Sequence, residues 1–112
     1  DGVQDVRWEI TQISGQKAKF FHHQPYLQFG SQFKQLQGNT GCNELAGSYD
    51  LDAGQRTVKL NARAGHFSCD GALAQEAVLM DALQDAERFQ LKGGQLMLQD
   101  KSGRDLLQAQ KK

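Results

Sequence analysis

The stretch RFQLKGGQLMLQDKSGRDLLQAQ, residues 88–110, decides the fold that we expect of this sequence. Two alternating runs, 88–92 and 95–99, are joined by Gly93-Gly94. A type I′ turn needs positive φ at both central positions, so two glycines between such runs indicate a hairpin. A second turn and a last apolar run, 105–110, follow. We therefore predict a three-stranded antiparallel meander at this end of the chain.

The segment before the meander, about residues 71–86, has the spacing of a helix. No proline interrupts it, and polar residues lie between the apolar ones. The apolar positions that recur every three or four residues are Leu73, Ala77, Met80 and Leu83. This repeat predicts one apolar helix face. Ser68 or Asp70 is expected to cap the start by accepting hydrogen bonds from free backbone N–H groups.

Earlier in the chain, short alternating runs separated by glycine-containing turns predict further strands. These runs are 7–13, 26–29, 33–37, 48–51 and 57–60. Residues 43–46 read as a tight connector, and Gly54 is available for positive φ in a hairpin turn. Strands and helices do not alternate, so the pattern predicts an α+β fold. We expect a mostly antiparallel sheet, small and curved or barrel-like, packed with one helix in a single domain over residues 1–112.

Composition limits the classes of function. The 112 residues carry 13 Lys+Arg and 13 Asp+Glu, so the formal net charge is zero. A neutral domain has no overall electrostatic attraction to nucleic acid. No run reaches the roughly 18–20 apolar residues of a membrane helix. The chain begins Asp1-Gly2-Val3 without an initiator Met, so we expect a leader that has been removed or a start chosen by design.

Cys42 and Cys69 are the only cysteines. They form no CxxC motif, and two cysteines alone do not complete a four-ligand zinc site. His22, His23 and His66 have no ligand spacing that would complete it. Two interpretations remain open from the spacing: a disulfide, worth about 3.5 kcal/mol on the chain-entropy model, or two free thiols. A thiol enzyme using Cys69 and His66 is disfavoured, because nothing in the sequence fixes the ring beside the sulfur or orients it.

Other catalytic patterns are missing from the sequence. The serines stand in no GxSxG context, and Gly38-Asn39-Thr40-Gly41 lacks the GK[ST] of a phosphate loop. Phe20, Phe21, Tyr26 and Phe33 lack interleaved Lys or Arg, so they are predicted to be core residues and not an RNA-binding face. We therefore predict no catalytic residue, no cofactor and no metal site.

One set of residues is distinctive in its order along the chain. Its members are Trp8, Gly41, Cys42, Asn43, Gly47, Tyr49, Cys69 and Glu76. A Trp-containing strand, a GCN turn, a glycine–aromatic strand, a cysteine before a helix and a closing meander resemble the META domain, the HslJ-like heat-shock family. The resemblance spans roughly Val6 to Gln110. Where the family usually has Thr and Met, this chain has Gly65 and Phe67. The threonine hydroxyl, with any role it has in the family, is therefore absent here.

The resemblance implies a compact domain that is exported to the bacterial envelope, in the periplasm or at the outer membrane. It implies a lipoprotein whose lipid anchor would lie outside these residues, with a role in stress response or antibiotic tolerance. No enzymatic activity is established for the family, and the resemblance favours a Cys42–Cys69 disulfide. We expect a monomer that binds an unknown protein or envelope component.

A second hypothesis is a carrier that holds a small apolar ligand against the curved sheet. The aromatic residues that motivate it are Phe20, Phe21, Tyr26, Phe29 and Phe33. An apolar cavity or groove of several hundred cubic ångströms would be its structural requirement.

Overall fold

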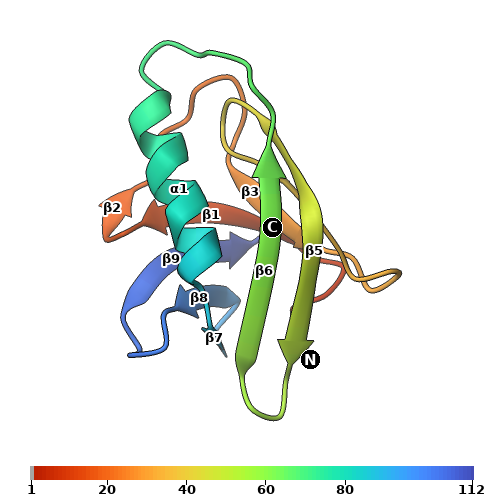
Figure 1. Ribbon diagram of the computed structural model, residues 1–112. Coiled ribbons are helices and arrows are strands. Elements are labelled where there is room, and N and C mark those ends of the chain that lie inside the picture. Colours follow the sequence, from red (N-terminus) through yellow and green to blue (C-terminus); the bar gives the residue numbers. More distant parts are fainter. Residues whose placement is uncertain (1) are drawn as a thin grey trace.

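The computed structural model describes residues 2–112, and Asp1 lies outside the described residues. Within this range the chain forms nine strands and one helix (Figure 1). In order, these are β1 (Arg7–Ile13), β2 (Gln16–Lys17), β3 (Tyr26–Phe29), β4 (Gln35–Asn39), β5 (Glu44–Asp52), β6 (Thr57–Ala64), α1 (Leu73–Asp85), β7 (Arg88–Lys92), β8 (Gln95–Gln99) and β9 (Asp105–Lys111). The expected α+β class is confirmed.

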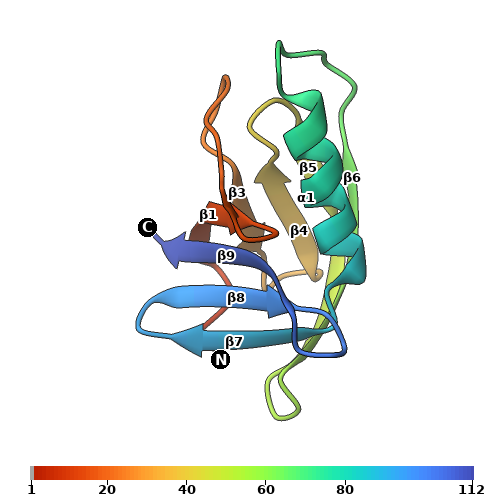
Figure 2. The same cartoon turned by 90° about the vertical axis from the view of Figure 1, so that its left-hand side faces the viewer.

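All strands belong to one antiparallel sheet that curves round on itself. Its order is β2-β1-β3-β4-β5-β6-β7-β8-β9, and β1 also pairs with β9. The first and last long strands therefore lie side by side (Figure 2). The weakest seam of this ring is between β6 and β7, which share a single pair, Thr57 with Arg88. The predicted curved sheet is confirmed.

The core fills the inside of the ring. Side chains alternate along each strand, so every second residue points inward. The largest fully buried residues are Trp8, Phe29, Ile10, Leu27, Leu36, Leu79, Leu83, Leu96, Leu98 and Leu107. Trp8 Nε1 donates to the carbonyl of Val3 at 2.9 Å, which gives the buried indole N–H a partner.

Helix α1 packs along β6 on the side where β7 diverges from that strand (Figures 1 and 2). A sheet edge carries unpaired backbone groups, and a helix laid beside it protects them from other strands. Within residues 2–112, no helix is long and apolar enough to span a bilayer.

The predicted helix is present, and its predicted apolar face is buried only in part, at Leu83 and partly at Met80. Leu79, Ala82 and Leu83 are the buried residues, while Leu73 is 80% exposed and Ala77 is exposed. Several helix faces contain apolar residues here, so the repeat alone does not select the one that meets the sheet. The predicted cap is also wrong, because the N-cap position is Ala72 and makes no side-chain hydrogen bond.

Glycines inside strands explain most of the misplaced strand boundaries. Gly38 lies in β4, and β5 includes residues 44–46, which were expected to be a connector. A Cβ atom at Gly47 would overlap the backbone of Asn61 on β6. These glycines therefore allow close strand pairing and do not mark turns.

Left-handed backbone positions account for two further differences. Phe33 has a φ of 60° and Lys34 a φ of 49°, so β4 begins after them and not at residue 33. In the β5–β6 turn, Arg56 takes the positive φ of 57° that was expected at Gly54. In addition, β6 runs on to Ala64, four residues beyond the expected end, and the short strand β2 was not predicted.

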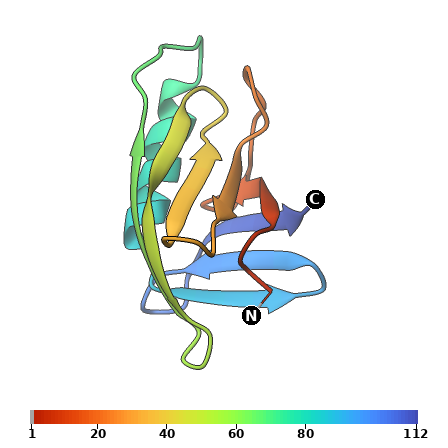
Figure 3. The same cartoon turned by 90° about the vertical axis from the view of Figure 1, so that its right-hand side faces the viewer.

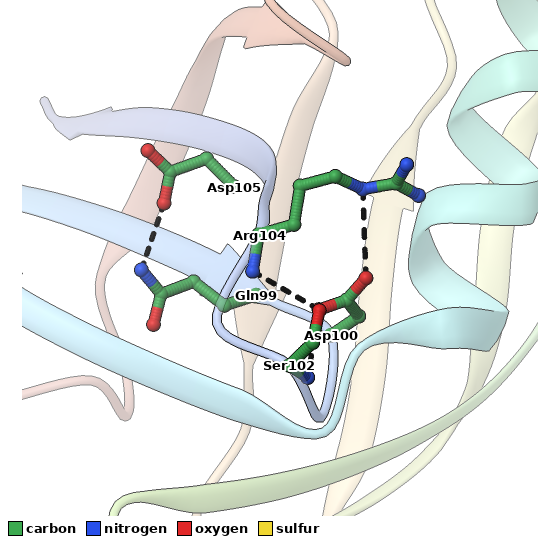
Figure 4. A network of polar contacts seen from close by, with 5 residues as sticks. All are labelled: Gln99, Asp100, Ser102, Arg104 and Asp105. Atoms are coloured by element: carbon green, nitrogen blue, oxygen red, sulfur yellow. Dashed lines mark hydrogen bonds and ion pairs between the residues drawn. The ribbon is translucent and has the colours of Figure 1, made fainter.

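The predicted meander is confirmed in detail. Gly93 and Gly94 have φ values of 58° and 80°, as the predicted hairpin turn requires. The next turn is closed by Asp100 (Figure 4), whose Oδ1 accepts from Ser102 N at 2.9 Å, Ser102 Oγ at 2.7 Å and Arg104 N at 3.0 Å. These bonds, led by that from the Ser102 hydroxyl, lower the pKa of Asp100 below its ordinary value.

Candidate functional site

The two cysteines meet at the end of the molecule where the β4–β5 turn faces the loop before α1. Cys42 and Cys69 form a disulfide with a Cα–Cα distance of 6.0 Å. The pairing that the family resemblance favoured is confirmed, and the alternative of two free thiols is wrong. A thiol enzyme using Cys69 loses its nucleophile for the same reason.

Asn43 joins the same two segments through its side-chain amide. Its Oδ1 accepts from Phe67 N at 2.7 Å, and its Nδ2 donates to Phe67 O at 3.0 Å and to Glu76 Oε2 at 2.9 Å. Asn43 is buried, so the amide has all its partners within the protein. The side chain connects the turn, the loop and the helix.

Thr40 belongs to this network and was not predicted. Its hydroxyl donates to Glu76 Oε2 at 2.6 Å and accepts from Cys42 N at 3.1 Å and Asn43 N at 2.8 Å. The only signal in the sequence is its position two residues before Cys42. Helix α1 brings Glu76 to it across 36 positions of sequence.

Gly65 has a role that its departure from the family pattern did not reveal. A Cβ at this position would lie 3.0 Å from Asn43 Oδ1. The glycine therefore leaves room for the Asn43 amide beside β6.

The other residues of the family pattern lie elsewhere. Trp8 and Tyr49 are core residues, and Tyr49 packs edge-to-face on Phe29 with ring centroids 5.2 Å apart. Gly47 allows the close pairing of β5 with β6. None of these three joins the Asn43–Glu76 network, so the pattern divides into a core group and a loop group.

Two loops extend from the disulfide end of the molecule, residues 18–25 and 65–72 (Figures 2 and 3). A groove of about 920 Å³ lies between them, and Cys42 and Cys69 both line it. Phe20 and Phe67, which also line it, are 65% and 80% exposed. An adjoining hollow of about 290 Å³ extends past Phe67 to Leu73, which is 80% exposed.

The loop 18–25 is held against the β4–β5 turn. The backbone N–H groups of His22 and His23 both donate to Gly41 O, at 3.0 and 3.1 Å. His22 Nδ1 lies 3.6 Å from Cys69 Sγ. The two rings are exposed, as expected of a surface loop.

The aromatic residues do not form one ligand-binding face. Phe29 is fully buried, whereas Phe33 is 86% exposed in the turn after β3. Phe20 lies in the loop before β3, at the other end of that strand. The prediction that Phe20 and Phe33 belong to the core is therefore wrong, and the five aromatic residues are divided between core, groove and a distant turn.

The charged and metal-binding residue types are scattered. Among residues 2–112, no group of three or more His, Cys, Asp or Glu is arranged to hold a metal ion. Arg7 is engaged in the groove, where its guanidinium lies 3.7 Å from the centroid of the Tyr26 ring. The disulfide end of the molecule therefore has a grooved surface with exposed apolar side chains.

Comparison with solved structures shows the same fold at low identity. A DUF4847 family protein from Bacteroides vulgatus superposes with a TM-score of 0.79 at 14% identity, over 97% of this chain and 94% of that chain. A protein from Burkholderia xenovorans, solved by NMR, gives a TM-score of 0.72 at 19% identity, over 98% of this chain and 83% of that one. No curated protein matches the sequence.

The family comparison agrees with the resemblance stated from the sequence. The META domain matches over residues 1–112. This chain belongs to the META domain family.

Proposed function

We propose that this chain is a non-enzymatic, HslJ-like domain of the bacterial envelope that binds a protein or another envelope component. The binding site is the loop-end surface, which we define as Phe20, Phe67 and Leu73 with the groove between the two loops. The observation that carries the proposal is the exposure of these three side chains, at 65%, 80% and 80%. Clustered apolar side chains on a surface are typical of interaction sites.

The scaffold under this surface is fixed by covalent and polar links. The disulfide ties the loop 65–72 to the β4–β5 turn, and the Asn43 amide binds the backbone of Phe67 in both directions. A surface that is already ordered loses less conformational entropy on binding. Phe67 is therefore presented from a rigid backbone although its ring is exposed.

The envelope location is supported by the disulfide, because such bonds persist in oxidising compartments and are rare in the cytosol. The roles in stress response and antibiotic tolerance, the lipid anchor and the monomeric state belong to the same proposal and rest on the family resemblance. Residues 1–112 would act as a single domain.

The test compares a double variant of the loop-end surface with a single Phe-to-Ser control elsewhere on the surface. We expect F20S/F67S to weaken binding to a partner recovered from an envelope extract at least tenfold, as measured with the purified partner. F33S removes an equally exposed phenylalanine at the other end of β3 and should change the affinity less than twofold. Equal affinities for the wild type and F20S/F67S would contradict the proposal, as would loss of binding in F33S alone.

A further inference from the structure

A second groove lies along the flank of α1, next to the bases of the two loops. It has a volume of about 220 Å³ and lies between residues 13–19 and residues 71–78. Ile13, Ala74 and Val78 supply apolar side chains to it, and Val78 is 40% exposed. We call it the helix-flank groove. It shares no lining residue with the groove beside Phe20.

The charges along this groove have one sign. Lys17 and Lys19 are the charged residues that line it. Asp70 and Asp81, which flank this half of α1 in the sequence, do not line it. Among residues 2–112, the ion pairs involve Lys34, Arg104 and Lys112, so neither lysine has an acidic partner there.

The backbone explains why both lysines line one groove. Ala18 is half-buried against the core, and its N–H donates to Thr11 O at 2.9 Å. In an extended segment, residues two apart point to the same side. Lys17 and Lys19 therefore both point away from the core.

Gln75 holds the two walls of the groove together. Its Oε1 accepts from Lys19 N at 2.7 Å, and its Nε2 donates to Lys19 O at 2.9 Å. This pair of hydrogen bonds attaches the segment after β2 to the first turn of α1. These two bonds therefore link the lysine-bearing segment to α1 at the groove.

We propose that the helix-flank groove binds the carboxylate form of a medium-chain fatty acid. The chain would lie on Ile13, Ala74 and Val78, and the carboxylate would reach the ammonium groups of Lys17 and Lys19. The volume is below the roughly 300–1,000 Å³ of pockets for drug-sized ligands, which suits a single slim acyl chain. The uniform positive charge selects an anion over a neutral alcohol of the same length.

The test is an NMR titration of the whole chain with octanoate, 1-octanol and hexanoate. We expect saturable shifts for octanoate at amides of residues 13–19 and 71–78. Each methylene that is buried should tighten binding by up to about fourfold, so hexanoate should bind more weakly. Octanol should bind about tenfold more weakly than octanoate, because it lacks the charge.

Charge-reversal variants supply the matched control. K17E/K19E should weaken octanoate binding about tenfold or more, since two favourable ion pairs become repulsive. K59E/K101E makes the same charge change beside a different hollow and should leave the affinity within twofold. Thermal melts monitored by circular dichroism confirm that both variants fold.

Several outcomes would overturn the inference. These are shifts that do not saturate, equal affinities for octanol and octanoate, an unchanged affinity in K17E/K19E, or binding to anionic lipid vesicles without binding of monomeric octanoate. F67S changes a residue of the loop-end surface that does not line the helix-flank groove, so it should leave octanoate binding unchanged and separate the two sites.

Discussion

At Asn43, both ends of one side-chain amide are used to join three segments of the chain. The amide makes two hydrogen bonds to the backbone of Phe67 and one to Glu76, at 2.7 to 3.0 Å. Thr40 shares the Glu76 carboxylate and also caps the turn. Removing one member therefore leaves several partly buried groups without partners, which costs more than an average hydrogen bond.

We expect N43A to lower the free energy of unfolding by about 2–4 kcal/mol, because hydrogen bonds are lost and their partly buried partners stay unpaired. Urea unfolding monitored by circular dichroism measures the change. N61A is the matched control, since Asn61 is exposed on β6, and should cost less than about 0.5 kcal/mol. A similar loss of unfolding free energy in N43A and N61A would show that the hydrogen bonds of Asn43 do not stabilise the fold.

Asp100 supports a prediction about acid stability. Its pKa is lowered in the folded protein, chiefly by the Ser102 hydroxyl, from an ordinary value of 3.8. A lowered pKa means that the ionised form stabilises the fold above the unfolded pKa, and that this stability is lost as the pH falls through the folded pKa. D100N should therefore have a lower melting temperature than the wild type at pH 7.

The same comparison at low pH provides the check. Below the folded pKa, Asp100 is neutral in both states, so the difference in melting temperature between D100N and the wild type should shrink to near zero. Asp5 also has a lowered pKa and keeps its contribution in both proteins. A difference in melting temperature that stays constant from pH 7 down to a pH below the folded pKa would contradict the assignment.

At the level of elements, the disulfide links the β4–β5 turn to the loop that leads into α1. It joins residues 27 positions apart. Helix α1 buries only Leu79, Ala82 and Leu83, and its first turn has no side-chain cap. The start of the helix is therefore held by Cys69, Glu76 and Gln75, through their contacts with other segments, more than by its own sequence.

We expect C42S/C69S to lose about 3–4 kcal/mol of unfolding free energy on the chain-entropy account of a disulfide. Guanidinium unfolding with and without dithiothreitol measures it. The reductant should destabilise the wild type by a similar amount and leave the serine variant unchanged. If C42S/C69S has the same free energy of unfolding as the oxidised wild type, the disulfide does not stabilise the fold.

At the level of the whole molecule, closure of the sheet into a ring determines where the loop-end surface and the helix-flank groove lie. Pairing of β1 with β9 brings the first and last long strands together, and Lys112 Nζ lies 3.6 Å from Glu9 Oε2. The helix covers the side of β6 that β7 leaves open (Figure 1). The loop-end surface and the helix-flank groove then lie where loops and α1 meet the ring.

Local sequence was sufficient for the elements whose signals are local. The glycine pair at 93–94, the strands β1 and β3, and the approximate span of α1 were all correctly predicted, because turn chemistry and periodicity act between near neighbours. The cysteine pairing was inferred through the family pattern and not from the spacing itself. The strand boundaries near Gly38 and Gly47 were predicted wrongly, because these glycines allow close approach of a neighbouring strand that the local sequence does not identify.

Only the folded chain decided which face of α1 is buried, and which residues meet Asn43. The helix has apolar side chains on more than one face, and the choice is made by contact with β6 and the ring. Thr40, Asn43 and Glu76 are brought together by long-range packing across up to 36 positions. No short-range pattern encodes such contacts, so the exposed apolar surfaces that carry the proposed binding sites became visible only in three dimensions.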